Sequence, residues 1–418
     1  MTLFQPSSLE DLRDVVGEIA AGGRPVEICG GGSKRALGCA MTVAGRIDLA
    51  RLSGIVDYQP AELVLTAQAA TPLAEIEAAL VEQGQMLAFE PPDWLALLAG
   101  EGPPAEPSLD DRSPSPTLGG AIACNLSGSR RIAAGAARDH FIGFVGVNGY
   151  GQIFKSGGKV VKNVTGYDLC KLMAGSHGTL AALAEISVKV MPRPESSASL
   201  AIIGLADDAA IAALADGLNA PHEVSAAAHL PARVTGQAAL PVGGPPATSI
   251  TLLRLEGLAA SIAFRMAGLR ALLAGRGALV ELAQSESEAL WRRIGAVAPL
   301  LPVANRLVWR LSLPPSAGPA VMAAITRDLD AIGYYDWGGG LIWLAVAPTR
   351  EDGGAAIIRA ALAPLGGHAT LVRAPEGLRA KVAVFEPLPA ALAALTQRVK
   401  DSFDPHHLFN PGRIYRDR

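Results

Sequence analysis

The sequence predicts an α+β protein whose first half is built from α/β units and whose second half is an antiparallel sheet with helices. Three observations lead to this class. The 418 residues are 50% hydrophobic and 18% charged, which suits large buried cores and a chain of two to three domains. Short strands run into glycine-rich loops and helices up to about residue 190. Beyond residue 196, strands and helices alternate with short connections.

In the first half, hydrophobic spacing and turn residues mark each element. Helices are expected over 6–20 and 72–83, and strands over 25–29, 63–69 and 184–191. Ser7 or Ser8 caps the first helix, and Gly84 follows the second. Residues 97–116 contain five prolines and several acidic residues, so we expect an exposed loop there.

In the second half, the expected elements fit two βαββαβ-like units within 196–375. Strands are expected near 198–204, 248–255, 306–313, 341–347 and 368–373, and helices near 207–218, 258–274, 286–298, 317–332 and 353–364. A last helix over 388–404 is expected to face inward with Leu388, Leu392, Leu395 and Val399.

The lysines mark a boundary near residue 190. Only 8 of the 36 basic residues are lysine; five lie between Lys155 and Lys189, and none lies between 190 and 380. The predicted domains are 1–195, 196–390 and a C-terminal helix and tail at 391–418 that returns to the first domain.

Composition excludes several classes of function. The net charge of −3 gives no support for nucleic acid as a partner. No apolar run is long enough to span a membrane and no signal peptide is expected, so the predicted location is cytoplasmic. The four cysteines have no C-x-x-C spacing and the seven histidines are scattered, so no metal site is expected.

Common catalytic and nucleotide motifs are absent from the sequence. There is no G-x-G-x-x-G after a strand, no phosphate-binding loop of the G-x-x-x-x-G-K-[ST] type, no G-x-S-x-G and no H-E-x-x-H. A nicotinamide dehydrogenase of the usual fold, a P-loop enzyme, a serine hydrolase and a zinc protease are therefore not indicated.

Four glycine-rich loops are present instead. They are Gly30–Lys34 after a strand, Thr117–Gly120 before an expected helix at 121–126, Gly135–Gly143 and Gly175–Leu180. Glycine lets backbone N–H groups approach an anion, and Ser33 and Lys34 add a hydroxyl donor and a positive charge, which would suit a pyrophosphate. A helix N-terminus behind Gly120 would favour phosphate as well. The alternative for each loop is a plain tight turn.

Together these loops resemble the FAD-binding domain of the vanillyl-alcohol oxidase/PCMH superfamily. Lys162–Leu169 is similar to the K-N-x-T-G-Y-D-L run of its D-lactate dehydrogenase and glycolate oxidase branch. The motifs at 307–314, 336–343, 366–370 and 403–415 resemble the GlcE-type FAD-binding subunits of bacterial glycolate oxidases. The resemblance covers nearly the whole chain and implies a PCMH-type FAD-binding domain of two α/β subdomains with an antiparallel α+β cap.

The resemblance also implies a set of cofactor-binding residues. They are Gly30, Gly31, Gly32, Ser33, Lys34, Leu118, Gly119 and Gly120 at the pyrophosphate; Asn125, Ser127 and Gly128 at the flavin or ribityl; Arg138 and Asp139 at the cleft; and Gly178, Thr179 and Ile186 near adenine or ribose. The loop at Ser33 has no histidine or cysteine of the kind that links flavin covalently, so non-covalent FAD is expected. His177 stands where the branch usually has glutamate.

The implied function is that of the FAD-binding subunit of a glycolate oxidase complex, which oxidises glycolate or a similar small 2-hydroxy acid. Its implied partners are a homologous catalytic flavoprotein subunit and an iron–sulfur subunit. A cation for the substrate carboxylate could come from Arg379, Lys381 or Arg413, and no catalytic base is identified. The branch's H-x-H-x-G-D metal motif is absent. A stand-alone FAD-dependent 2-hydroxy-acid dehydrogenase and a non-catalytic scaffold with the flavin fold remain alternatives.

Overall fold

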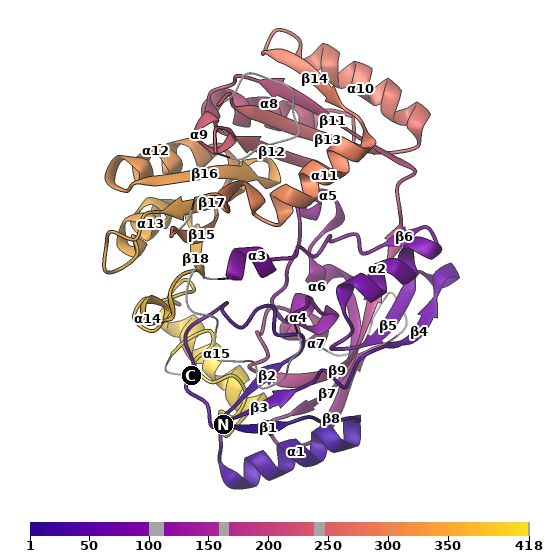
Figure 1. Cartoon of the computed structure of the whole chain (residues 1–418), viewed down its shortest axis with the longest axis vertical. Coiled ribbons are helices and arrows are strands. Elements are labelled where there is room, and N and C mark those ends of the chain that lie inside the picture. Colours follow the sequence, from indigo (N-terminus) through magenta and orange to yellow (C-terminus); the bar gives the residue numbers. More distant parts are fainter. Residues whose placement is uncertain (100–112, 159–166, 238–246, 304, 417–418) are drawn as a thin grey trace.

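The computed structural model places the two halves of the chain one above the other, with both termini in the lower part (Figure 1). The structure describes residues 1–99, 113–158, 167–237, 247–303 and 305–416. Most of the proline-rich loop expected at 97–116 lies outside these residues, as does the stretch 162–166 of the Lys162–Leu169 motif.

Two sheets form the lower part. The first is parallel and has the order β1 (Thr2–Phe4), β3 (Gly45–Asp48), β2 (Val26–Cys29). The second is antiparallel and has the order β4 (Ile55–Gln59), β5 (Val64–Gln68), β9 (Ala181–Lys189), β7 (Phe141–Asn148), β8 (Ile153–Gly157). A short pair joins β6 (Gln85–Met86) to β10 (Met191–Pro192).

Helices of the lower part are short apart from the first two. They are α1 (Leu9–Gly22), α2 (Leu73–Glu82), α3 (Leu95–Leu98), α4 (Leu118–Ala123), α5 (Arg131–Ala134), α6 (Ala137–His140) and α7 (Leu169–Met173), with a 3-10 turn η1 (Pro60–Glu62). The expected cap of the first helix is Ser8, whose hydroxyl accepts a hydrogen bond from the N–H of Asp11 at 3.0 Å. Gly23 ends that helix with φ +59°, a conformation that favours glycine.

The upper part is one eight-stranded antiparallel sheet. Its order is β14 (Ala278–Leu282), β11 (Ser196–Ile203), β13 (Ile250–Gly257), β12 (Ala226–Leu230), β16 (Ala331–Asp336), β17 (Leu341–Val346), β15 (Leu307–Ser312), β18 (His368–Arg373). Its helices are α8 (Asp207–Asn219), α9 (Ala232–Thr235), α10 (Ala259–Leu273), α11 (Gln284–Gly295), α12 (Gly318–Asp328) and α13 (Ala355–Leu362), with 3-10 turns η2 (Ala298–Leu300), η3 (Pro315–Ala317), η4 (Trp337–Gly339) and η5 (Ala363–Leu365).

The expected pair of βαββαβ units is confirmed. The first unit runs from β11 to β14 and the second from β15 to β18, and within each unit the spatial order of strands is fourth, first, third, second. The units join edge to edge where His229 of β12 pairs with Tyr335 of β16. An antiparallel α+β architecture is therefore present in this half, as predicted.

Three strands of this sheet were not predicted from the sequence: β12, β14 and β16. The first reads Ala-Ala-Ala-His-Leu, which has no β-branched or aromatic residue. Its strand conformation comes from hydrogen bonding to β13 along its whole length, so pairing in the tertiary structure overrides a weak local preference.

The last helix buries only part of the predicted face. Helices α14 (Glu376–Arg379) and α15 (Ala390–Phe403) lie beside the lower part in Figure 1. Leu392 and Leu395, expected to face inward, are 47% and 48% exposed, and Lys400 is buried instead. The prediction was wrong for these two leucines, whereas Val399 packs against the core of the five-stranded sheet as predicted. The ammonium of Lys400 finds three oxygen acceptors, so the helix can bury a charged residue.

The inner face of the eight-stranded sheet covers the lower part. Its outer face packs against α8, α10, α12 and α13. On the inner face, the rings of Trp343 and Trp94 meet edge to face at 5.3 Å, and Leu126 after α4 belongs to the same apolar cluster. The second half is therefore fixed over the segment that follows α4.

Candidate functional site

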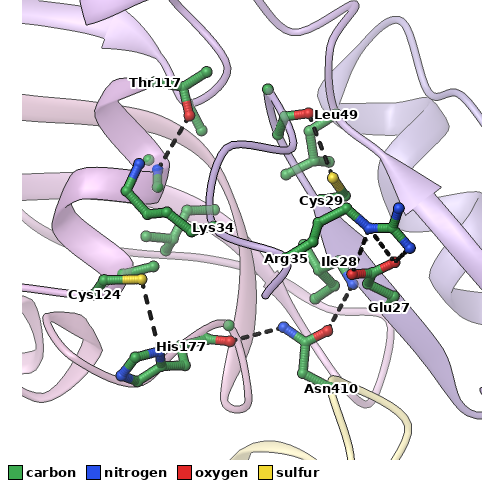
Figure 2. A pocket seen from close by; sticks show the side chains of 18 of the residues that line it. Glu27, Ile28, Cys29, Lys34, Arg35, Leu49, Thr117, Cys124, His177 and Asn410 are labelled. Carbon is green, nitrogen blue, oxygen red and sulfur yellow. Dashed lines mark hydrogen bonds and ion pairs between the residues drawn. The ribbon is translucent and has the colours of Figure 1, made fainter. Parts of the chain in front are cut away.

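A pocket opens between the two sheets of the lower part. Its walls come from the loop after β2, the start of α4, the loop before β9 and the C-terminal tail, as Figure 2 shows.

The loop after β2 offers backbone donors to this pocket. Among the described residues, none accepts a hydrogen bond from the N–H groups of Gly30, Gly31 or Gly32. A Cβ added at Gly31 would overlap the carbonyl oxygen of Ser115, so only glycine permits the close approach of the two loops there. A run of free N–H groups of this kind suits an anion.

The start of α4 does not offer free donors, contrary to expectation. Its N–H groups are already bonded: Leu118 to Thr71 O at 3.0 Å, Gly119 to Ala69 O at 2.8 Å and Gly120 to Thr117 Oγ1 at 3.2 Å. The helix also begins three residues earlier than predicted, at Leu118. The role of Gly119 is steric, because an added Cβ would lie 2.7 Å from the carbonyl oxygen of Ala69.

Lys34 places a buried ammonium in the pocket. Its Nζ donates to Ser33 Oγ at 3.0 Å and lies 3.4 Å from where a Gly120 side chain would begin. Within the described part of the chain, no carboxylate pairs with it, and burial lowers its pKa. An uncompensated buried cation is unfavourable, so this side chain is suited to bind an anion that enters the pocket.

Three polar side chains of the pocket are uncharged at neutral pH. Burial first, and then the charge of Arg413, lowers the pKa of His177 to about 3. Burial raises the pKa of Cys124, whose Sγ lies 3.6 Å from Nδ1 of His177. Cys29, at the end of β2, has its pKa raised to about 11, chiefly by burial. Both thiols therefore remain protonated.

The C-terminal tail completes the pocket. The side-chain oxygen of Asn410 accepts from the N–H of Ile28 at 2.8 Å, and its Nδ2 donates to the carbonyl oxygen of His177 at 2.7 Å (Figure 2). Arg413 donates to the carbonyl oxygen of Lys34 at 2.8 Å. The tail thus returns to the first domain at the site itself, some 380 residues from β2.

Glu27 is a charged residue of the pocket that the motifs did not single out. Burial acts to raise its pKa, but hydrogen bonding and charge from Arg35, together with Arg413 and Arg46, lower it. Sequence reasoning missed Glu27 because side chains alternate between the two faces of a strand, and a charged residue is expected on the face toward solvent. The burial of Glu27 is explained by Arg35, Arg46 and Arg413, whose positive charges lie around its carboxylate in the folded chain.

The predicted site residues divide into two groups. The pocket is lined by Gly30, Gly31, Gly32, Ser33, Lys34, Gly119, Gly120 and Gly178. Outside its lining lie Leu118, Asn125, Ser127, Gly128, Arg138, Asp139, Thr179 and Ile186.

Most residues of the second group have structural partners. Asn125 Oδ1 accepts from the N–H of Arg138 at 3.0 Å, and Ser127 Oγ accepts from that of Ala137 at 2.9 Å. Asp139 caps its own helix, and Ile186 is fully buried in the core of the five-stranded sheet. Their assignment to the cofactor stays a prediction.

Two of the three cations predicted for a substrate carboxylate have hydrogen-bond partners within the chain. Arg379 donates to the carbonyl oxygens of Gly38 and Ala374, and Arg413 is occupied by Lys34 and Glu27. Lys381 is exposed. Arg413 also lines the pocket, and the assignment of any of these three cations to a substrate carboxylate stays a prediction.

The residues present fit a dinucleotide such as FAD. A pyrophosphate needs backbone donors and a cation, which Gly30–Gly32 and Lys34 supply, while the neutral wall at Cys124 and His177 suits uncharged parts of a cofactor. Among the described residues, no cluster of three or more His, Cys, Asp or Glu side chains could hold a metal ion. No described helix is long and apolar enough to cross a membrane.

Comparison with known proteins agrees with this fit. Residues 2–100 match the family described as FAD binding domain. The chain is 35% identical to glycolate oxidase subunit GlcE of Escherichia coli K12 over 94% of this chain and 93% of that protein. It is 41% identical to glycolate oxidase subunit GlcD of Bacillus subtilis, over only 24% of this chain and 21% of that protein.

A solved structure shows the same fold at low identity. The 4-ethylphenol oxidase from Gulosibacter chungangensis superposes with a TM-score of 0.72 at 15% identity, over 99% of this chain and 89% of that one. The full-length similarity to GlcE, the matched FAD-binding region and the shared fold confirm the predicted resemblance and FAD as the cofactor. The chain belongs to the GlcE family of FAD-binding oxidoreductases.

Proposed function

We propose that this chain is the FAD-bearing subunit of a glycolate oxidase complex and takes part in oxidising glycolate, or a similar small 2-hydroxy acid, to the 2-oxo acid. The observation that carries the proposal is the pocket with Lys34 and its glycine loop, in a chain 35% identical to GlcE over 94% of its length. We further propose domain boundaries at 195/196 and 390/391. The first is supported by its place between β10, which pairs in the lower part, and β11, which belongs to the eight-stranded sheet.

The residues of this chain would hold and shield the cofactor. Lys34 and the N–H groups of Gly30–Gly32 would bind the pyrophosphate, and Asn410 would keep the tail against it. Bound FAD supplies a two-electron acceptor for oxidation of an alcohol carbon. The inner face of the eight-stranded sheet excludes water above the segment after α4.

Non-covalent binding of FAD is the first prediction. The purified chain should be yellow, and acid precipitation should leave the flavin in the supernatant, because Cys29 and Cys124 are protonated thiols and His177 is buried and neutral. The absorbance spectrum before and after precipitation measures this. A yellow pellet would show a covalent link, and a colourless protein would favour the scaffold alternative.

The outer surface of α10 supports assembly with other subunits. Phe264 is 81% exposed, Leu258 is 64% and Leu272 is 45%, and the neighbouring exposed positions are mainly alanine. Helices that are apolar all round are normally covered. We propose that the homologous flavoprotein subunit covers this surface, in a complex that also contains an iron–sulfur subunit and is cytoplasmic or peripheral at the inner membrane.

Phe264→Glu should weaken that assembly. A buried charge in place of an aromatic anchor is expected to reduce the affinity by roughly tenfold or more. Co-expression with the two partner subunits, followed by size-exclusion chromatography, measures the complexed fraction. Leu365→Glu is the matched control, because Leu365 is also exposed (37%) but lies on η5. Equal assembly of the Phe264 variant and the control would place the interface elsewhere.

A further inference from the structure

Two arginines lie against the ring of Trp337, where the two halves of the chain meet. The Nε1 of Trp337 donates to the carbonyl oxygen of Gly128 at 3.1 Å. The guanidinium of Arg131, from α5, lies 4.6 Å from the centre of its ring, and that of Arg310, from β15, lies 5.0 Å away. The backbone of Trp337 has φ +53°, which is unfavourable for a large side chain, so surrounding contacts hold the indole in place.

Carboxylates act on these two arginines from a distance without pairing with them: Asp139 acts on Arg131 and Asp336 on Arg310. Among the described residues, no hydrogen bond or ion pair joins Arg131 or Arg310 to a carboxylate, whereas the nearby Arg254 is held by both oxygens of Glu90 at 3.0 Å. Burial first, and then the charge of Arg131, lowers the pKa of Arg310 to about 10, although the charge of Asp336 acts to raise it. Two guanidiniums that lie against one indole, with no carboxylate paired to either, favour the binding of an anion beside them.

Polar side chains flank Arg310 on the same face of the sheet. Thr370 lies directly opposite it on β18, and His368 pairs with Ser312 two residues along. Diagonal neighbours of this kind are within reach of long side chains. Partial burial, and then the charges of Arg310 and Arg131, lower the pKa of His368, although Glu386 acts to raise it. Its imidazole is therefore neutral at pH 7 and can accept a hydrogen bond.

We propose that Arg131 and Arg310 bind the carboxylate of a small 2-hydroxy acid, with His368 and Thr370 beside its hydroxyl group. A guanidinium can donate two parallel hydrogen bonds to a planar carboxylate, and both guanidiniums lie against the ring of Trp337. This inference rests on the proposed function and names the substrate site for it. The segment after α4 connects Cys124, in the wall of the cofactor pocket, to Arg131 within seven residues.

Binding can be measured without turnover. Isothermal titration of the FAD-loaded chain with glycolate, and with the uncharged glycolamide, tests for recognition of the carboxylate. The wild-type chain should bind glycolate and not glycolamide. Arg310→Gln and Arg131→Gln should each weaken glycolate binding at least about tenfold, because each removes a charge-assisted hydrogen bond. Arg306→Gln, which loses a pair with Asp330 on the same part of the sheet, should bind as the wild type does.

The outcomes separate this site from the proposed function. Three results would overturn the site: glycolate binding unchanged in both variants, no glycolate binding by the wild-type chain, or equal binding of glycolamide. In each case a yellow protein would still support an FAD subunit. A colourless wild-type chain that binds glycolate through these arginines would support the site and contradict the FAD proposal. If Arg310→Gln fails to fold, Arg131→Gln on the short helix α5 still decides the question.

Discussion

Replacing Lys34 by methionine is expected to strip the protein of most of its FAD without weakening the fold. The ammonium is buried and has only Ser33 Oγ as a partner in the described structure, so it contributes to binding an anion and not to an internal ion pair. Loss of a charge-assisted contact to a phosphate should lower the affinity for FAD by at least about tenfold. Methionine has a similar length and removes a buried charge, so the apo protein should be as stable or more stable.

Two measurements on the same preparations check this result. Titration of the apo protein with FAD gives the affinity, and urea unfolding of the apo protein gives its free energy of unfolding. Lys155→Met, on the exposed surface of β8, is the control and should leave both unchanged. If Lys34→Met kept wild-type affinity, the pyrophosphate would have to lie elsewhere. If the apo variant were clearly destabilised, Lys34 would have a structural role.

Replacing Asp404 by alanine is expected to destabilise the protein by about 3–5 kcal/mol, the usual effect of breaking a buried ion pair. Asp404 is fully buried, and its carboxylate accepts from Lys400 Nζ at 2.6 Å and from the N–H groups of Leu408 and Phe409 at 3.0 and 2.8 Å. Alanine would leave the ammonium of Lys400 buried with only carbonyl partners, at Thr179 and Phe409.

The free energy of unfolding in urea measures this effect. Asp401→Ala is the matched control, because Asp401 lies on the same helix but is 49% exposed, and its pair with His407 should contribute little. The double variant Lys400→Met/Asp404→Asn should recover part of the loss, since it removes both charges and keeps an acceptor for the tail. A loss in Asp404→Ala no larger than in the control would contradict this account of the tail.

Much of the fold was predictable because its signals are local. Ser8 and Gly23 mark the ends of α1 by rules that act within four residues. Strand β12 was missed because three consecutive alanines have little strand preference by themselves. On α15, Val399 packs inward as predicted, but Leu392 and Leu395 do not. Apolar spacing cannot show that Thr179, Asp404 and Phe409 surround Lys400.

The sequence by itself determined the class of fold, the family and the glycine loop with Lys34, because glycine runs and cap residues have the same conformational meaning wherever they occur. Only the tertiary structure decided how the second loop works: the donors of α4 are used by Thr71, Ala69 and Thr117, which leaves Lys34 and the first loop to face the pocket. It also brought Arg131 and Arg310 to one indole from segments 179 residues apart in the chain. Recognition of a charged ligand depends on which groups lie close together in the fold and on which other groups they contact. The spacing of residues in the sequence shows neither of these.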